Sequence, residues 1–192
     1  MGRPRNFDQD EILGKAVEIF RARGYAGTSL DDLEKGLGLG RQSLYNTFGD
    51  KDALYAAALR RYREDGLARF REVLRDPRPV RVVLREFLLA AAQDSREQPD
   101  SWGCLVLNAA LERSGDAACS KLVAGNNEAL VSALAERLAR DQASGDLGAH
   151  HDPVALAGFL LSVLLGLRIY ARTAKDSRAA EGIVRHALAA LG

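Results

Sequence analysis

The chain has 192 residues, of which 47% are hydrophobic and 28% are charged, and its formal net charge is +1. This length allows one large domain or two small ones, and the composition is ordinary for a soluble globular protein. A net charge near zero excludes a simple electrostatic argument for a polyanionic partner, so a role in nucleic-acid binding would depend on where the charges lie.

Helical periodicity runs along the whole chain, and no long segment alternates apolar and polar residues, so we expect an all-α fold of about nine helices. Gly24 follows two arginines and ends the first helix, Asp50 caps the fourth, and Pro77 and Pro79 end that long helix. The expected helices span about residues 9–23, 29–36, 41–48, 51–75, 80–96, 101–113, 116–142, 153–173 and 177–191.

The segment from Thr28 to Leu54 has the pattern of a helix-turn-helix unit, in which a second short helix enters the major groove of DNA. Its apolar residues are spaced to hold such a unit together, which leaves one face of the helix at 41–48 polar. We assign the base contacts to Arg41, Gln42, Ser43 and Asn46. Arginine pairs bidentately with guanine, and glutamine or asparagine with adenine. The alternative is an ordinary solvated helix face.

Other polar residues near this helix suit the DNA backbone. Contacts to phosphate are predicted for Thr28, Tyr45, Thr47 and Lys51. The leading Gly2-Arg3-Pro4-Arg5 is typical of an arm in the minor groove, with Arg3 and Arg5 as its contacts. A disordered tail is the equal alternative for this arm in the absence of DNA.

These residues resemble the N-terminal signature of the TetR/AcrR family of bacterial transcriptional regulators over about residues 8–55. The resemblance is carried by Phe20, Gly24, Tyr25, Thr28, Ser29, Leu44, Tyr45, Phe48 and the segment 51–54. One departure is Gly40, where the family often has a serine that caps the recognition helix. Glycine is only slightly worse as an N-cap, so this departure weakens the resemblance little.

The resemblance implies a DNA-binding domain at residues 1–50 and a ligand-binding and dimerisation domain at residues 51–192. It implies a cytoplasmic homodimer, most simply a repressor that binds a palindromic operator and is released by a small-molecule or thiol-reactive inducer. No cofactor and no membrane are expected as partners. The inducer, the operator sequence and the choice between repression and activation remain open at this stage.

Two cysteines without an export signal, Cys104 and Cys119, indicate reduced thiols in a cytoplasm rather than a disulfide framework. With Ser101 as N-cap, Cys104 is predicted in the first turn of a helix, where the helix dipole favours the reactive thiolate. The sequence Gly103-Cys104-Leu105 with Asn108 resembles a motif in one subset of the family, some members of which sense electrophiles or oxidants. The alternative is a small buried residue that packs against the preceding helix.

A ligand pocket is predicted more loosely, because each of its residues could equally belong to an ordinary core. The candidates are Trp102, Cys104, Asn108, Phe70, Phe87 and Arg168. Adjacent His150 and His151 invite a metal interpretation, but a solvated loop explains them better, so no metal site is predicted.

The uncharged run from Val154 to Leu167 is too short for a membrane span when counted from Pro153 to Leu167, since a bilayer core requires about 20 residues. A helix apolar on most faces is expected to be buried on most faces, here between its own domain and a partner subunit. The helices at about 153–173 and 179–191 are therefore predicted to form half of a four-helix dimer interface.

An enzyme is the rival class, and the sequence argues against it. The three histidines fit no metal or catalytic-triad spacing, and Gly36-Leu37-Gly38-Leu39-Gly40 lacks the preceding strand of a dinucleotide loop. A purely architectural DNA-binding protein would not need the long helical region after residue 50. The sequence therefore predicts a DNA-binding regulator that is not an enzyme.

Overall fold

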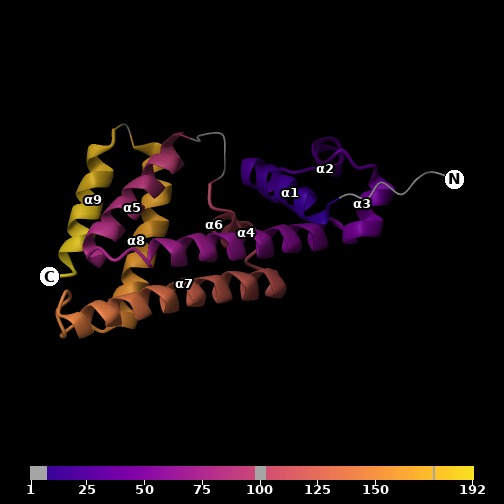
Figure 1. Ribbon diagram of the computed structural model, residues 1–192. Helices are drawn as coiled ribbons and strands as arrows, with labels where there is room; N and C mark the ends of the chain where they lie inside the picture. The colour runs from indigo at the N-terminus through magenta and orange to yellow at the C-terminus, as the bar shows by residue number, and fades with distance from the viewer. Residues whose placement is uncertain (1–7, 98–102, 175) are drawn as a thin grey trace. The chain divides into compact units, whose positions relative to one another are not determined.

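The structure is a computed structural model that describes residues 8–97, 103–174 and 176–192. Over these residues it contains nine α-helices and no strand, which confirms the predicted all-α class (Figure 1). The helices are α1 Gln9–Arg23, α2 Leu30–Leu37, α3 Arg41–Phe48, α4 Lys51–Val73, α5 Val80–Glu97, α6 Leu105–Glu112, α7 Ala117–Ser144, α8 Pro153–Thr173 and α9 Arg178–Ala189.

The described residues form two compact units, and the chain passes between them more than once. The first unit contains residues up to 65 together with those from 103 to 123, and the second contains residues 66–97 and those from 124 onwards. The helices α4 and α7 each contribute to both units. This division differs from the predicted boundary at residue 50, because α6 and the start of α7 pack with the N-terminal helices rather than with the helices that follow.

Local capping explains where the helices of the first unit begin and end. Asp8 accepts a hydrogen bond from the Asp10 amide at the start of α1, and Ser29 forms a reciprocal capping box with Asp32 at the start of α2. Gly24 ends α1 with φ +70°, a backbone conformation that glycine adopts without steric cost. Asp50 caps α4 as predicted, because its carboxylate accepts from the Ala53 amide at 2.7 Å.

The core of the first unit is built from the apolar faces of α1, α2, α3, the first half of α4, and α6. Its buried residues are Ile12, Ala16, Val17, Phe20, Leu33, Leu37, Leu39, Leu44, Leu54, Tyr55, Ala58, Leu59, Leu105, Val106, Ala109 and Cys119. The rings of Phe20 and Tyr25 both meet Tyr55 edge-on, with centroids 4.9 and 5.0 Å away. This packing ties α1 and the segment before α2 to α4.

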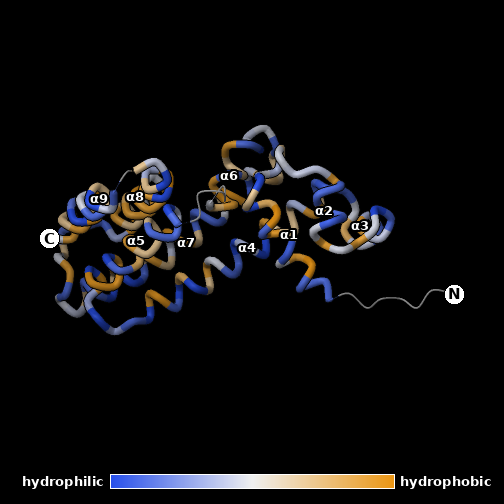
Figure 2. The backbone as a smooth tube through the Cα atoms, turned by 90° about the horizontal axis from the view of Figure 1, so that it is seen from above, coloured by the Kyte–Doolittle hydropathy of each residue, from blue (hydrophilic) through white to orange (hydrophobic). Residues whose placement is uncertain are grey.

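The second unit is held together mainly by α5, α8 and α9, which lie side by side (Figure 2). Its core includes Leu84 and Leu88 of α5, Leu160 and Leu167 of α8, and Val184 of α9. The helix α8 is apolar in composition, and Figure 2 shows hydrophobic residues where it is labelled.

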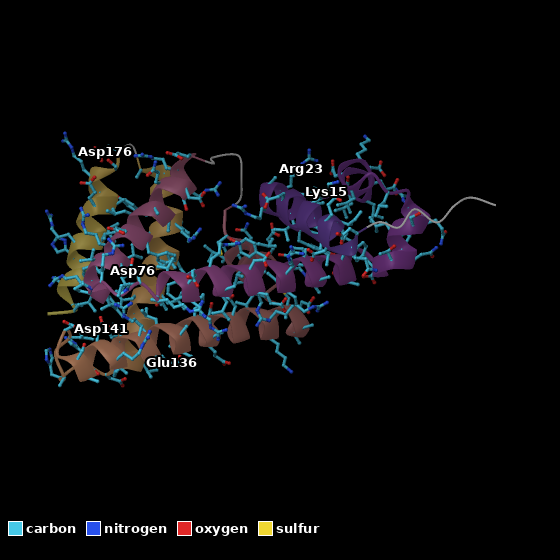
Figure 3. The ribbon with its side chains drawn as sticks, viewed as in Figure 1. Lys15, Arg23, Asp76, Glu136, Asp141 and Asp176 are labelled. Carbon is cyan, nitrogen blue, oxygen red and sulfur yellow. The ribbon has the colours of Figure 1, made fainter. Side chains whose placement is uncertain are left out.

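A buried arginine fixes the segment between α4 and α5 in this unit. Arg137 of α7 donates to the carbonyls of Leu74, Asp76 and Arg78 at 2.8, 2.6 and 2.5 Å and pairs with Asp141 at 2.7 Å. Figure 3 labels Asp141 on α7 and Asp76 in the connecting segment. Pro77 and Pro79 have no N–H group to donate to the carbonyls at the end of α4 and in the connecting segment. Arg137, from a helix distant in sequence, supplies hydrogen-bond donors to these carbonyls instead.

Within this chain, α8 is buried on one side only, and its expected burial against a partner subunit stays a prediction. The helix has 21 residues, long and apolar enough by composition to cross a membrane, but only 28% of its most apolar window is buried. Val154, Phe159, Ile169 and Tyr170 are exposed large hydrophobic residues. The buried side faces α5 and α9, and the opposite side is open in this chain.

Candidate DNA-binding interface

The two helices of the predicted helix-turn-helix are α2 and α3, joined by a three-residue turn. Gly38 caps α2 with φ +67° in the left-handed region, and its N–H donates to the Glu34 carbonyl. Gly40 is the N-cap of α3 and has no side chain to bond the first-turn amides, as the sequence predicted. Leu33, Leu37 and Leu44 are buried and hold the two helices together.

Every residue assigned to base contacts lies on the exposed face of α3. Arg41, Gln42, Ser43 and Asn46 are all exposed, while Leu44 between them is fully buried. Gln42 Nε2 donates to Asn46 Oδ1 at 3.0 Å, so these two amides form one polar surface along the helix. Such a surface presents both donors and acceptors, which adenine recognition requires.

Arg41 is not a free side chain, and sequence reasoning missed its partners. Its Nε donates to Glu34 Oε1 at 2.5 Å, and its Nη2 donates to Asp31 Oδ1 at 2.6 Å. The hydrogen bond to Glu34 is the main cause that raises the pKa of Arg41 above its usual value. The acids were visible in the sequence three residues apart on α2, but only the packing of α2 against α3 brings them to this arginine.

The residues assigned to phosphate divide in the structure. Tyr45 is exposed on α3, as a phosphate contact requires. Thr47 is exposed too, but its hydroxyl donates to the Ser43 carbonyl at 2.7 Å. Thr28 departs from the expectation: its side chain is buried, and its hydroxyl donates to the Gly24 carbonyl at 2.6 Å. Since Ser29 rather than Thr28 caps α2, Thr28 serves the packing between α1 and α2 in this conformation.

Lys51 begins α4 and is held against Tyr25. Its ammonium lies 4.1 Å from the centre of the Tyr25 ring, and the guanidinium of Arg113, the C-cap of α6, lies at the same distance from that centre. Asp52 accepts hydrogen bonds from the Tyr25 hydroxyl at 2.7 Å and pairs with Arg113 at 2.6 Å. Partial burial lowers the pKa of Lys51. The position of Lys51 is therefore fixed by a network that sequence reasoning did not identify.

That network attaches the segment between α1 and α2, and the start of α4, to the end of α6. Glu112 accepts from the Tyr25 amide at 2.6 Å, and Arg113 also pairs with Asp116 at 2.5 Å. The hydrogen bond from the Tyr25 hydroxyl is the first cause that lowers the pKa of Asp52. The end of α6 thus contacts the segment between α1 and α2 directly, 87 residues away in sequence. No local pattern could have predicted this contact.

The structure changes the assignment of the sensor cysteine. The helix α6 begins at Leu105, so Cys104 is its N-cap, with extended backbone angles, rather than a residue of its first turn. The cause is Gly103, which has φ +85° and interrupts any helix that would start earlier. Cys104 is partly buried and packs against the core of the first unit. Ser101 and Trp102 lie outside the described residues.

The other pocket candidates do not form one group. Asn108 of α6 is buried in the first unit, and its Nδ2 has no hydrogen-bond partner within the described part of the chain. In the second unit, Phe70 is a buried core residue whose ring lies 5.0 Å from that of the half-buried Phe87. Arg168 is partly buried on α8. Phe70 and Phe87 therefore lie together in the second unit, whereas Cys104 and Asn108 lie one turn apart in the first, where the Asn108 amide donates to the Cys104 carbonyl at 3.0 Å.

The N-terminal arm with Arg3 and Arg5 also lies outside the described residues. Over the part of the chain that the structure describes, no cluster of His, Cys, Asp and Glu could hold a metal ion. The rings of His150 and His151 contact each other, with centroids 3.9 Å apart and planes tilted by 41°.

Both the N-terminal and the C-terminal parts of the chain match known protein families. Residues 12–58 match the profile of the bacterial regulatory proteins of the tetR family, and residues 81–187 match a tetracyclin repressor-like C-terminal domain. The HTH-type transcriptional regulator YezE of Bacillus subtilis is 33% identical over 178 residues, which cover 92% of each chain. The repressor ComR of Escherichia coli is 31% identical over 89% of this chain and 82% of its own.

The solved structures agree. One neighbour is a cysteine mutant of the TetR family transcriptional regulator CifR in complex with 26-bp double-strand operator DNA. It aligns with this chain over the whole length of both, with a TM-score of 0.84 and 32% sequence identity. The reduced form of E. coli NemR has the same fold, with a TM-score of 0.78 at 22% identity over 94% of this chain and 95% of its own. The chain therefore belongs to the TetR family of bacterial transcriptional regulators, and it is a DNA-binding regulator rather than an enzyme.

Proposed function

We propose that the chain is a homodimeric repressor that reads a palindromic operator through α3 and is released by an inducer. The observation that carries this proposal is the exposed polar face of α3, whose side chains match the donors and acceptors of base edges. Two relatives add support, because ComR is named a repressor and CifR is bound to its operator. A dimer with two-fold symmetry would place its two recognition helices about 34 Å apart, in successive major grooves.

Two substitutions test the roles of the residues in DNA binding. We expect Arg41→Ala to lose discrimination at one base pair in each half-site, worth roughly 1–3 kcal/mol for a bidentate contact. We expect Lys51→Ala to weaken binding to all sequences and to reduce the slope of log K against log salt by about 1. Binding would be measured on a duplex selected by the wild type from a random library. Unchanged specificity of Arg41→Ala would refute the assignment of α3 to the groove.

The dimer interface is proposed on the open side of α8 and α9. Phe159 and Val163 of α8 and Gly182 and Ile183 of α9 line an apolar groove there. A stable interface buries about 800 Å² on each partner, and a second copy of these two helices would supply such a surface. Regulators of this family are soluble cytoplasmic proteins, so a protein partner suits this face better than lipid.

Sedimentation velocity tests the interface. We expect the wild type to sediment as a dimer and Phe159→Arg as a monomer, because a buried unpaired charge is strongly unfavourable. Leu111→Arg is the matched control, since Leu111 is exposed on α6 in the other unit and should leave the dimer intact. A dimeric Phe159→Arg protein would contradict the proposed interface.

The inducer would act on the second unit or on Cys104. Because α4 and α7 continue from one unit into the other, they are the elements through which a change in the second unit would reach α3. Linkage then requires operator DNA to weaken inducer binding by the same factor by which the inducer weakens operator binding. For the thiol, Cys104 is the N-cap of α6 and is only partly buried, so a reagent in solution can reach it.

Operator binding of the wild type and of Cys104→Ser before and after treatment with N-ethylmaleimide distinguishes the two kinds of inducer. Since the operator complex of CifR contains a cysteine mutant, cysteines substituted in that relative are not required for its operator binding. Cys104→Ser should likewise bind the operator untreated. A wild-type protein that keeps its affinity after complete modification of Cys104 would exclude the thiol-reactive mechanism and leave a reversible small ligand.

A further inference from the structure

The guanidinium of Arg41 forms hydrogen bonds with its Nε and Nη2 atoms, while its Nη1 donors are unused among the described residues. Nε and Nη2 form the edge that faces Glu34 and Asp31 of α2. A guanidinium has five N–H donors, of which these two bonds use two. Neither of these hydrogen bonds, which are those of the Arg41 side chain within the described part of the chain, involves Nη1. Three N–H donors therefore remain, two on Nη1 and one on Nη2, and these form the open edge.

The carboxylates of Asp31 and Glu34 belong to a helix that is fixed at its start and packed along its inner face. Asp31 and Glu34 lie one turn apart on the outer face of α2, while Leu33 and Leu37 on its inner face are fully packed in the core. The capping box of Ser29 and Asp32 fixes the start of the same helix. Glu34 is the more enclosed of the two acids, with 27% of its side chain exposed against 70% for Asp31. Glu34 therefore limits the orientation of Arg41 more strongly.

We propose that Glu34, with Asp31 beside it, is a positioning residue that presents the open edge of Arg41 to a guanine in the major groove. This inference rests on the base contact proposed for Arg41. The two terminal nitrogens are the donors that pair with O6 and N7 of guanine, and the bonds to α2 leave them available. Ordering the side chain before it binds reduces the conformational entropy lost on binding.

The carboxylates of Asp31 and Glu34 would also disfavour binding to DNA that lacks the operator sequence. Near the groove they repel phosphates wherever Arg41 has no guanine to bind, so they lower non-specific affinity. The opposite role would be that of competitors, which hold Arg41 away from DNA in the free protein. The two roles differ in sign, because removing a competitor strengthens operator binding, whereas removing a positioning residue weakens discrimination.

Glu34→Gln tests this role, because it keeps the length of the side chain and removes its charge. Binding of the full-length wild type, Glu34→Gln and Arg41→Ala would be measured on the selected operator, on duplexes with single guanines replaced by 7-deazaguanine, and on a scrambled duplex. A bidentate contact discriminates by roughly 5- to 150-fold. At the guanine where Arg41→Ala loses discrimination, we expect Glu34→Gln to lose about three- to tenfold. Its affinity for scrambled DNA should be unchanged or higher.

A charge-matched control separates positioning from general electrostatics. Glu11 is an exposed acid on α1 that pairs with Lys15, so Glu11→Gln removes the same charge without affecting Arg41 and should keep full discrimination. Asp31→Asn provides a second variant, with a smaller loss expected because Asp31 is the more exposed acid. Thermal melting by circular dichroism checks that each variant is folded.

The outcomes separate this inference from the proposed function. If Arg41→Ala shows no dependence on any guanine, the proposed base contact itself is wrong. If Arg41→Ala loses that dependence while Glu34→Gln and Asp31→Asn keep it in full, only the positioning role is refuted. Higher affinity of Glu34→Gln for operator and scrambled DNA alike, with unchanged discrimination, would identify the acids as competitors and would also overturn the inference.

Discussion

The buried arginine of α7 offers the sharpest test of what stabilises the second unit. Arg137 donates to the carbonyls of Leu74, Asp76 and Arg78 and pairs with Asp141, whose other oxygen accepts from a backbone amide of α5 at 3.0 Å. The side chain of Arg137 is 6% exposed and that of Asp141 is 9% exposed. The substitution Arg137→Met keeps the aliphatic volume and removes every donor at once.

The expected cost follows from the groups that remain. Removing one partner of a buried ion pair costs about 3–5 kcal/mol, because the other charge stays buried without compensation. The three carbonyls also lose their donor, although water can reach those at the edge of the segment. Asp141→Asn should cost less, about 1–3 kcal/mol, because Arg137 keeps its three carbonyl acceptors and an amide oxygen can still accept from α5.

Urea unfolding followed by circular dichroism measures the loss of stability, at a fixed protein concentration because association would change the apparent value. Hydrogen exchange of the backbone amides of the non-proline residues in 74–80 measures the loss locally, and its rate should rise strongly in Arg137→Met. Arg140→Met is the control, since Arg140 is an exposed residue of the same helix with only one long bond, of 3.5 Å, to the Leu74 carbonyl. If Arg137→Met unfolds at the same urea concentration as Arg140→Met, the clamp contributes nothing and this reasoning is wrong.

Three further predictions concern the first unit. Gly24→Ala should cost at least about 1–3 kcal/mol, because φ +70° is strained for alanine and its Cβ would overlap the Glu112 carboxylate; an unchanged melting temperature would contradict this. The hydrogen bond from the N-cap serine hydroxyl lowers the pKa of Asp32 from 3.8 to about 2. The ionised Asp32 carboxylate therefore stabilises the fold above pH 3.8, and this stabilisation is lost as the pH falls towards 2. The difference in the free energy of unfolding between wild type and Asp32→Asn should shrink over that range. A constant difference would refute the role of Asp32. Burial raises the pKa of Cys119, so iodoacetamide should modify the native protein at Cys104 first, as mass spectrometry would show; equal rates would indicate that Cys119 is accessible.

The features that the sequence predicted correctly depend on a few neighbouring residues. Ser29 with Asp32, Gly24 and Asp50 mark helix ends through contacts that span one turn, so their spacing alone is diagnostic. The exposed face of α3 followed from the same reasoning, since burying Leu44 forces its neighbours outwards. Helical periodicity and capping depend on interactions between residues within a turn or two of each other, so they can be predicted from the sequence.

The features that were missed join residues far apart in the chain. Glu112 binds the amide of Tyr25, and Arg137 binds the carbonyls before α5, across 87 and about 60 residues respectively. Cys104 was misplaced by one turn because Gly103 adopts a positive φ that composition does not reveal. In each case the determining fact is a tertiary contact or a backbone angle, which depends on how the helices pack.

The charge balance of the first unit shows how packing changes the meaning of a sequence. Residues 1–60 contain nine Lys or Arg and nine Asp or Glu, which gave no reason to expect affinity for a polyanion. In the structure, acids of α1 and α2 neutralise arginines of the same unit, as Asp32 does for Arg23 and Glu34 for Arg41. We expect a unit neutralised in this way to gain little from phosphates alone and therefore to bind non-specific DNA weakly. If the proposed contacts of Arg41 hold, its preference for an operator would depend on the few donors whose orientation these ion pairs fix, and specificity would be favoured at the expense of affinity.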